Sequence, residues 1–588
     1  MRSRSRLIIM FSILGVFGLL GGLLPIITGA QTAAHLQDVV PQKPGFPLVL
    51  PTDVIGFGKI SLADITGDGK LEIVVGTREG KVVAANYLGQ ILWIYDASAE
   101  LNAAAVAQGL RPNQQPATVR TKPAVGDLTG DGVPEIVVTV GDILTAPSNG
   151  GIVVLNNAGI ALPGWPIVSP DEGGAGVQFE LPNGYADGLI TSPAIGDVTG
   201  DGVPEIVYAG NYRVHVRTVA GVYRYPYVSP GDNPDATEFG WPQFVLDTIW
   251  ASPAIADINN DGINDIVIGV DAHNESWYFR ESETWRYTNE GGDMYVFNGD
   301  GSIQWIANQD EIFQSSPAVV DTDNDGNYEI IAGTGTFYSE AQNRPVGRYI
   351  SAWNHTGGPY SGNNYRWRTP LPAQIFGSPA IGNLIGNGQL EVVVGGMDGF
   401  VYALDATTGQ LLWRVQPQTL QGPLVAPLYS PVLADYDGDG LQDVFIAIGW
   451  EVAVLKGSTG EQFTATSFPS ALPSYYGDHT IDGTPAIGDL DGDGRLELVA
   501  ASGTLPPVFP NAPFNPQRGQ IYVWELPVSN TTSAWPQFRL NAANSGTVPR
   551  TVLPPPPTPT PTPPIKAEYQ FFLPSVYRSL MPIPYPAP

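Results

Sequence analysis

The chain has 588 residues and a formal net charge of −29, with 57 Asp and Glu, 28 Lys and Arg, and no cysteine. With so few basic residues and no basic stripe, a nucleic-acid partner is not expected. The lack of cysteine excludes disulfides, thiolate zinc sites and cysteine nucleophiles.

Residues 1–30 predict a secretory signal. A start with three arginines is followed by the apolar stretch Leu7–Ile27 and by Thr28-Gly-Ala30, a small-residue cleavage site. The apolar stretch is long for a signal, so an uncleaved membrane anchor is the alternative. Either way, we expect the protein to be secreted or held at the cell surface.

One acidic pattern returns eight times between Ala63 and Val499. Its first copy runs from Asp64 to Glu72, with oxygen-bearing side chains at positions 1, 3, 5 and 9 and a glycine at position 6. Calcium takes about six to eight oxygen ligands, and a tight loop with alternating oxygens can supply them. We expect these four side chains to bind calcium, with the carbonyl of position 7 and water completing the shell.

An EF-hand begins in the same way but needs a glutamate at position 12 between two helices. Position 12 of the first copy is Val75, within a β-branched run that is typical of a strand. An EF-hand is therefore excluded. A solvated acidic turn without metal is the other alternative, and eight aligned copies weigh against it.

The sixth copy departs from the pattern, because Asn383, Ile385 and Asn387 replace the acids and only Glu391 remains. We expect a turn of the same shape there without an ion, which leaves about seven structural calcium sites. These ligands explain much of the negative charge without a cationic partner. The predicted ligands are Asp64, Thr66, Asp68, Glu72, Asp127, Thr129, Asp131, Glu135, Asp197, Thr199, Asp201, Glu205, Asp257, Asn259, Asp261, Asp265, Asp321, Asp323, Asp325, Glu329, Asp435, Asp437, Asp439, Asp443, Asp489, Asp491, Asp493 and Glu497.

Strands and turns fill the sequence between the acidic copies, with almost no helical periodicity. The shortest unit predicts strands over 378–381, 390–394, 400–404 and 411–413. Four antiparallel strands per unit describe the blade of a β-propeller. We therefore predict an all-β propeller over residues 45–548 with eight blades, or seven if a terminal copy is not a full blade.

Two terminal segments suggest how the ring closes. Gly45-Phe-Pro47 and Ala534-Trp-Pro-Gln-Phe538 are similar to Gly240-Trp-Pro-Gln-Phe244 inside the array. We interpret all three as outer-strand segments, one of which completes the blade at the other terminus. Four tryptophans at strand positions are predicted to lie in the blade cores: Trp93, Trp305, Trp413 and Trp524.

The run Ser-Pro-Ala-Ile-Gly-Asp-x-x-Gly-Asp-Gly-x-x-Glu-Ile-Val resembles the FG-GAP/VCBS repeat, the blade of integrin α-subunit propellers. Segments of the form Gly-x-Val-Tyr-x-Leu and Gly-x-x-Leu-Trp are also similar to quinoprotein-type blades. The resemblance covers about residues 45–548. It implies the propeller fold and a calcium-ligand role for the acid positions, but it implies no activity.

Alternate loops of an antiparallel meander emerge on one face, so the acidic loops share one rim and the long insertions share the other. The insertions 271–291, 335–347 and 503–518 are predicted to join second and third strands. The insertions 96–120, 170–189 and 467–482 are predicted to link blades. Long loops on a rigid scaffold are where binding sites are usually built.

The 271–291 insertion is the strongest candidate for ligand binding. Its aromatic and basic residues suit a sugar or a protein, and the alternative is that they plug the central opening. The candidate residues are Trp277, Tyr278, Arg280, Trp285 and Tyr287.

No catalytic constellation is recognisable, so we expect a module that is not an enzyme. The runner-up is a calcium-dependent polysaccharide lyase of the eight-bladed type, by analogy, with His273, Arg280, Lys456 and His479 as base and charge clamp. A purely structural surface protein is the third hypothesis.

The composition changes near Pro549. Residues 549–565 predict an extended Pro/Thr-rich linker, and 566–588 a short tail for envelope attachment or a disordered end. Together these features predict a monomeric, exported, calcium-binding propeller that recognises a glycan or protein at the cell envelope on the face opposite the calcium loops.

Overall fold

The computed structural model describes residues 40–50, 60–141, 147–171, 183–210, 213–225, 240–245, 248–272, 276–279, 284–287, 291–309, 311–335, 348–357, 365–419, 422–423, 430–449, 451–463, 475–476, 483–502, 519–529 and 533–549. The predicted signal, the tail and nearly all of the linker lie outside these ranges. Residues up to Pro549 form one compact unit, and the propeller described below lies within it.

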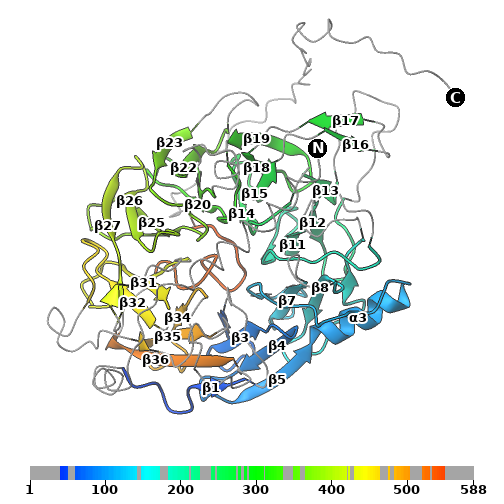
Figure 1. Ribbon diagram of the computed structural model, residues 1–588, viewed down its shortest axis with the longest axis horizontal. Helices are drawn as coiled ribbons and strands as arrows, with labels where there is room; N and C mark the ends of the chain where they lie inside the picture. Colours follow the sequence, from blue (N-terminus) through cyan, green and yellow to red (C-terminus); the bar gives the residue numbers. More distant parts are fainter. Residues whose placement is uncertain are drawn as a thin grey trace, which may run out of the picture. The chain divides into compact units, whose positions relative to one another are not determined.

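Eight four-stranded antiparallel sheets form the blades of a propeller, and colour follows them once around the ring in Figure 1. This confirms the predicted all-β fold and decides for eight blades. In seven sheets the strands lie in chain order from the innermost strand outward, and in blade 8 the N-terminal strand takes the outermost place. The blades are blade 1, β2 (Ser61–Ala63), β3 (Glu72–Gly76), β4 (Lys81–Ala85) and β5 (Ile91–Asp96); blade 2, β6 (Ala124–Gly126), β7 (Glu135–Val140), β8 (Gly151–Leu155) and β9 (Ile167–Val168); blade 3, β10 (Ala194–Gly196), β11 (Glu205–Gly210), β12 (Arg213–Arg217) and β13 (Gln243–Phe244); blade 4, β14 (Ala254–Ala256), β15 (Asp265–Ala272), β18 (Gly291–Phe297) and β19 (Ile303–Gln309); blade 5, β20 (Ala318–Val320), β21 (Glu329–Gly333), β22 (Tyr349–Asn354) and β23 (Tyr365–Pro370); blade 6, β24 (Ala380–Gly382), β25 (Glu391–Gly395), β26 (Val401–Asp405) and β27 (Leu411–Val415); blade 7, β30 (Val432–Ala434), β31 (Asp443–Ile448), β32 (Glu451–Leu455) and β33 (Tyr475–Tyr476); and blade 8, β34 (Ala486–Gly488), β35 (Arg495–Ala501), β36 (Gln520–Ser529) and β1 (Leu48–Val49).

The ring is closed by the N-terminal strand. β1 pairs antiparallel with β36, with Leu48 opposite Ile521, and so supplies the outermost strand of blade 8. Each innermost strand contacts that of the next blade, and β34 contacts β2. The prediction that one terminal segment completes the blade at the other end is therefore confirmed for the segment that follows Gly45.

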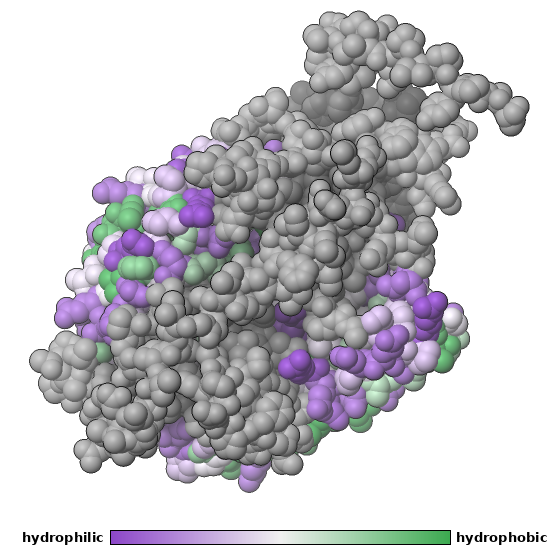
Figure 2. Space-filling model, in the orientation of Figure 1, coloured by the Kyte–Doolittle hydropathy of each residue, from purple (hydrophilic) through white to green (hydrophobic). Residues whose placement is uncertain are grey.

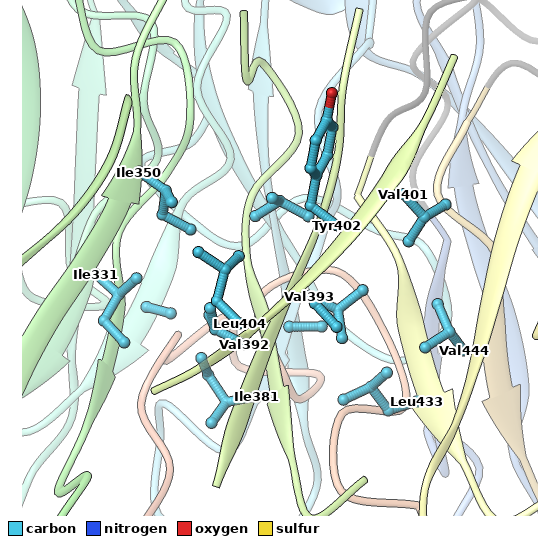
Figure 3. Close-up of a cluster of buried hydrophobic side chains, with 14 of the residues drawn as sticks. Ile331, Ile350, Ile381, Val392, Val393, Val401, Tyr402, Leu404, Leu433 and Val444 are labelled. Carbon is cyan, nitrogen blue, oxygen red and sulfur yellow. The ribbon is translucent and has the colours of Figure 1, made fainter. Parts of the chain in front are cut away.

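Buried β-branched side chains hold neighbouring blades together. The second and third strands are continuous apolar runs, such as the fully buried Glu72–Gly76 and Val401–Asp405, because both faces of each blade pack against another blade. Figure 3 shows one such interface, where Ile350 of blade 5, Val392 and Leu404 of blade 6 and Val444 of blade 7 belong to one buried cluster.

A belt of buried serines links the blades near the centre. The residue before the Pro-Ala pair of each unit donates its backbone N–H to the serine hydroxyl at the same place in the next blade. Five such bonds of 2.8–3.0 Å run in sequence from Lys122 through Ser192, Ser252, Ser316 and Ser378 to Ser430. The repeated Ser-Pro-Ala run therefore serves contacts between blades as well as the inner strand.

The tryptophans of the outer strands also join neighbouring blades. Trp93 donates its indole N–H to the Asn157 carbonyl of blade 2 at 2.9 Å, and Trp413 donates to the Gly457 carbonyl of blade 7 at 2.8 Å. Trp305 and Trp524 are buried as predicted, whereas Trp93 and Trp413 are half-buried and pack at the boundary between blades.

The segment 533–548 lies in the middle of the ring, which corrects the prediction of an outer strand at Ala534–Phe538 (Figure 1). It follows the blades in order and accepts backbone N–H bonds of 2.7–2.9 Å from the inner strands of six blades. These bonds run from Leu433 to the Trp535 carbonyl, Ile487 to Pro536, Val125 to Ala542, Ile195 to Ala543, Ile255 to Ser545 and Val319 to Gly546. The inner strands have an open edge at the centre, and this segment satisfies it.

Two connections differ from the sequence interpretation. The 96–120 link contains a helix, α3 (Ala97–Ala107), in which Asp96 caps Ala99 N–H at 3.0 Å. The 467–482 insertion was predicted to link blades, but β33 lies within it. Its first part therefore joins the third and fourth strands of blade 7, and only the part after Tyr476 leads to blade 8.

Candidate metal centres

Each acidic copy joins the first and second strands of one blade, so all eight loops lie on one rim of the ring. We call the copy in blade 1 acidic loop 1, and so on to acidic loop 8. The loops also touch one another. The Asn264 side chain in loop 4 donates to the Asp197 carbonyl in loop 3 at 2.7 Å, and Ile263 approaches the position that a Cβ on Gly200 would take.

The carboxylates build the turn themselves. In loop 1, Asp64 accepts the N–H groups of Gly67 and Gly69 at 2.6 and 2.8 Å, and Asp68 accepts that of Lys70 at 2.9 Å. Gly69 has φ +84°, and the glycine at position 6 has a positive φ between 82° and 88° in every copy. The glycine at position 6 is therefore required by the backbone, as the sequence predicted.

The acid at position 9 is buried in all eight blades, and it accepts the N–H of position 2 at 2.7–3.1 Å. Burial raises the pKa of these carboxyls, to about 7 for Asp265, Asp443 and Glu497. Nearby positive charge or a metal would be needed to keep them ionised.

The loops differ in what faces these acids. In loops 1 and 2, within the described part of the chain, no lysine or arginine pairs with the carboxylates. The nearby Lys70 donates to the Tyr87 hydroxyl at 2.8 Å instead. In loop 4 the side chain next to Asp265 is the neutral Gln304, which donates to Asn298 Oδ1 at 2.8 Å. The carboxylate oxygens of Asp64, Asp68 and Glu72 are ligands of the kind that calcium prefers. The same holds for the carboxylates at the corresponding positions of loops 2 and 4.

In four other loops a basic side chain of the same blade reaches the ligand positions. Arg224 pairs with Asp201 and with Glu205, whose Oε1 lies 2.7 Å from Nε. Arg366 pairs with Asp323 and with Glu329, whose Oε1 is 2.7 Å from a guanidinium nitrogen. These contacts were not predicted from the sequence.

Lysines have the same place in blades 7 and 8. Lys456 Nζ lies 2.7 Å from Asp437 and 3.0 Å from Asp439, and the bond to Asp437 raises the pKa of Lys456. Lys43 Nζ lies 2.7 Å from both Asp491 and Glu497. In loops 3, 5, 7 and 8, carboxylates at the predicted ligand positions therefore already pair with a lysine or arginine side chain.

The three loops with an acid at position 3 bring the most carboxylates together. Their ligand atoms lie within 4.8 Å of one another in the groups Asp321, Asp323 and Asp325; Asp435, Asp437 and Asp443; and Asp489, Asp491 and Asp493. In each group the acid at position 3 is one that contacts the chain cation.

Loop 6 keeps the turn without most of its acids. Asn383 accepts Gly386 N–H at 2.9 Å, Asn387 accepts Gln389 N–H at 2.8 Å, and Glu391 accepts Leu384 N–H at 2.7 Å. Burial raises the pKa of Glu391, and its Oε1 has no hydrogen-bond partner. The predicted turn shape is thus present at this copy.

Residues 435–500, from acidic loop 7 through β35, match the model of the FG-GAP-like repeat. The match falls on the same acidic pattern that recurs in all eight blades of the ring. The chain is a β-propeller that contains an FG-GAP-like repeat. No curated protein sequence matches it significantly.

Three solved structures are similar to the FG-GAP propeller in fold. The V. cholerae biofilm matrix protein Bap1 has 16% identity and a TM-score of 0.40, over 88% of this chain and 97% of its own. BamB from Moraxella catarrhalis has 13% identity and a TM-score of 0.35, over 66% and 77%. The C-terminal WD40 domain of Sif2 has 11% identity and a TM-score of 0.41, over 82% and 99%.

The opposite rim of the FG-GAP propeller carries the extra elements. The buried Asn149 holds three of its loops together: its side chain donates to the Arg111 carbonyl and to Asn113 Oδ1, both at 2.8 Å, and accepts Ala186 N–H at 2.9 Å. A short hairpin, β28 (Gln418–Thr419) and β29 (Gly422–Pro423), lies in the link between blades 6 and 7.

The 271–291 insertion contains a hairpin of β16 (Ser276–Phe279) and β17 (Thr284–Tyr287), with Tyr278 opposite Trp285 in register. In Figure 1 this hairpin lies outside the ring of blades, while 533–548 occupies the centre. The side chains of the candidate residues Trp277, Tyr278, Arg280, Trp285 and Tyr287 lie outside the described part of the structure.

The lyase grouping is not supported at Lys456. Lys456 contacts acidic loop 7, whereas the 271–291 insertion joins a second and a third strand and so emerges on the opposite rim. His273, Arg280 and His479 lie outside the described residues. Of the other histidines, His215 is buried, stacks on Tyr208 at 4.4 Å and bonds the Tyr223 hydroxyl at 2.8 Å, so it belongs to the core of blade 3.

Proposed function

We propose that this FG-GAP propeller is an exported calcium-binding module that recognises or adheres to a glycan or protein at the cell envelope. The observation that carries the calcium part is the geometry of the acidic loops. They present carboxylates at fixed places on one rim, and in loops 1 and 2 these carboxylates pair with no basic residue among the described ones.

Calcium in these loops has a structural role in this proposal. It binds Asp64, Asp68 and Glu72, with their counterparts in other loops, and reduces the repulsion between carboxylates that one turn holds together. An ion that binds only the folded state stabilises it by mass action. This role also explains how an exported protein without cystine is stabilised.

Recognition is assigned to the rim opposite the acidic loops. The segment 533–548 lies at the centre of the ring and accepts backbone bonds from the inner strands of six blades. The extra elements, α3 and the β16–β17 and β28–β29 hairpins, are all on connections of the other rim. The described surface visible in Figure 2 is mainly hydrophilic with scattered apolar side chains.

Export is expected from residues 1–30, which lie outside the described ranges. No helix among the residues that the structure describes is long and apolar enough to span a bilayer. A stop after Pro549 tests the proposed attachment by the tail: the truncated protein should move from the envelope fraction to the medium if the tail is the anchor.

Thermal unfolding tests the calcium part. The melting temperature should fall in chelator, recover with calcium and not recover with magnesium, because magnesium demands a smaller and more regular octahedral shell. Identical melting curves in chelator and in calcium would contradict a structural role for calcium.

Retention on a ligand matrix tests recognition. The protein should be retained on an envelope or acidic-glycan matrix without changing it, and a variant with 273–290 replaced by a short turn should be released. A rise in ultraviolet absorbance from unsaturated sugar ends would instead support the lyase. Neither retention nor product would support a purely structural surface protein.

A further inference from the structure

We propose that the acidic loops divide into two classes. In loops 3, 5, 7 and 8, a lysine or arginine side chain of the protein, called the chain cation below, takes the place of calcium. Calcium then goes to loops 1, 2 and 4. This inference rests on the proposed calcium role of the rim and changes the expected number of ions from about seven to three.

The position-9 carboxylates in loops 3, 5 and 8 carry the first step. One oxygen of Glu329 accepts Thr322 N–H at 2.9 Å, so only Oε1 faces the centre of the loop, and Arg366 contacts that atom at 2.7 Å. The same division holds for Glu205, which uses Val198 N–H and Arg224, and for Glu497, which uses Leu490 N–H and Lys43. The oxygen that a calcium ion would need is therefore bound to a cation of the chain.

Loop 7 reaches the same state in another way. Both oxygens of Asp443 accept backbone N–H groups, from Tyr436 at 3.0 Å and Gly457 at 2.9 Å. Lys456 then bridges Asp437 and Asp439 at positions 3 and 5. The ammonium group is bound to two of the four ligand carboxylates, and the other two, Asp435 and Asp443, accept backbone N–H groups.

Charge explains why the three loops with the most acids all have a chain cation. Loops 5, 7 and 8 have four acids, one more than loops 1 and 2, and the additional acid at position 3 contacts the cation in each case. A buried carboxylate with a chain cation at hydrogen-bonding distance is already compensated, and removing one partner of such a pair is costly. A calcium ion in these loops would have to displace that partner.

Blades 4 and 5 provide a natural exchange. Gln304 and Arg366 both precede the tryptophan of the fourth strand, Trp305 and Trp367. Arg366 donates to Glu329 Oε1 at 2.7 Å, whereas the neutral Gln304 lies next to Asp265 and donates to Asn298 Oδ1 at 2.8 Å. One loop thus has a neutral partner where the other has a charged one. Exchanging the two residues should exchange the classes of the two loops.

Native mass spectrometry and calcium titration of the full folded chain test this. The wild type should bind three calcium ions, Arg366→Gln should bind one more, and Gln304→Arg should bind one fewer. Arg414→Gln is the matched control, because Arg414 pairs at 2.8 Å with Asp398, outside the acidic loops, and its loss should leave the number unchanged.

The outcomes separate the two proposals. Seven ions in the wild type, or an unchanged count in both Arg366→Gln and Gln304→Arg, would overturn the division into classes while leaving calcium binding intact. If neither the wild type nor any variant bound calcium, the proposed calcium role itself would fail. Should Arg366→Gln not fold, Gln304→Arg alone still decides, since a cation in loop 4 must cost one ion.

Discussion

The central segment can be tested by replacing its largest side chain, Trp535, with alanine. Trp535 is 2% exposed and belongs to the apolar cluster of blades 5 to 7. Loss of a buried tryptophan side chain costs about 3–5 kcal/mol. The backbone bond between Leu433 N–H and the Trp535 carbonyl, 2.9 Å long, can remain in the variant, so the loss reports packing at the centre.

The expected shift in melting temperature follows from the size of the ring. An unfolding entropy of about 2.1 cal/mol/K per residue gives about 1 kcal/mol/K for a domain of about 500 residues. Trp535→Ala should therefore lower the melting temperature by about 3–5 °C in scanning calorimetry, with the chain otherwise intact and calcium held constant. A shift below 1 °C would show that Trp535 is not packed in the core and would refute the central placement.

Two truncations give the control. A stop after Pro549 removes only residues beyond the propeller unit and should leave the transition unchanged. A stop after residue 532 removes the central segment, leaves six inner strands without their partner, and should broaden the transition and lower it far more than Trp535→Ala. Equal transitions for the two truncations would contradict a structural role for 533–549.

Three further predictions concern single sites. Gly159→Ala should lower the free energy of unfolding in urea by about 2–4 kcal/mol, because Gly159 has φ +74° and a Cβ there would lie 2.4 Å from the Trp93 ring. The control is Gly109→Ala, which should cost only about 1 kcal/mol because Gly109 has φ +91° but open space around it. Glu391→Gln should change the free energy of unfolding by less than about 0.5 kcal/mol at pH 7, because Glu391 Oε1 has no hydrogen-bond partner. Glu329→Gln weakens the pair with Arg366 and should cost about 1–3 kcal/mol. Equal losses in the two variants would contradict this distinction. Burial holds the pKa of His215 well below its usual value, so on acidification through pH 6.5 the unfolded chain gains a proton at this residue that the folded chain does not. The buried carboxyls of Asp265, Asp443 and Glu497 act in the opposite direction, so the His215 effect is measured as a difference between variants: between pH 7.5 and 5.5, the wild type should lose about 1.4 kcal/mol of stability relative to His215→Phe. An equal pH dependence of the two proteins would exclude this cause.

The sequence predicted what local repetition determines. The eight units, the acidic turn with its glycine and the strand positions of blade 6 all follow from short-range patterns, and the structure confirms them. The helix α3 was missed although its signal is local: Asp96 is a capping residue before an alanine-rich stretch.

Partners that are distant in sequence could not be predicted in this way. Ala534–Phe538 shares the letters Trp-Pro-Gln-Phe with residues 241–244, which include the outer strand β13, yet its neighbours are inner strands. Only the closed ring brings those strands around it. Lys43 is 454 residues from Glu497, and Arg366 is 37 residues from Glu329. No local pattern marks such a lysine or arginine as a ligand of an acidic loop.

The position-9 acid has a role in the turn that does not depend on an ion. In every blade, including blade 6 where the other acids are missing, this carboxylate accepts the N–H of position 2 and closes the turn between the first two strands. Asn387 also accepts the N–H of position 7, as Asp68 does in loop 1. The motif therefore builds the turn first, and an ion is only one way to balance the charge that this turn brings together. An arginine, a lysine or the absence of two acids are the others. In the division proposed above, the two classes of loop therefore differ in the side chains that face their carboxylates, and not in the acidic pattern alone.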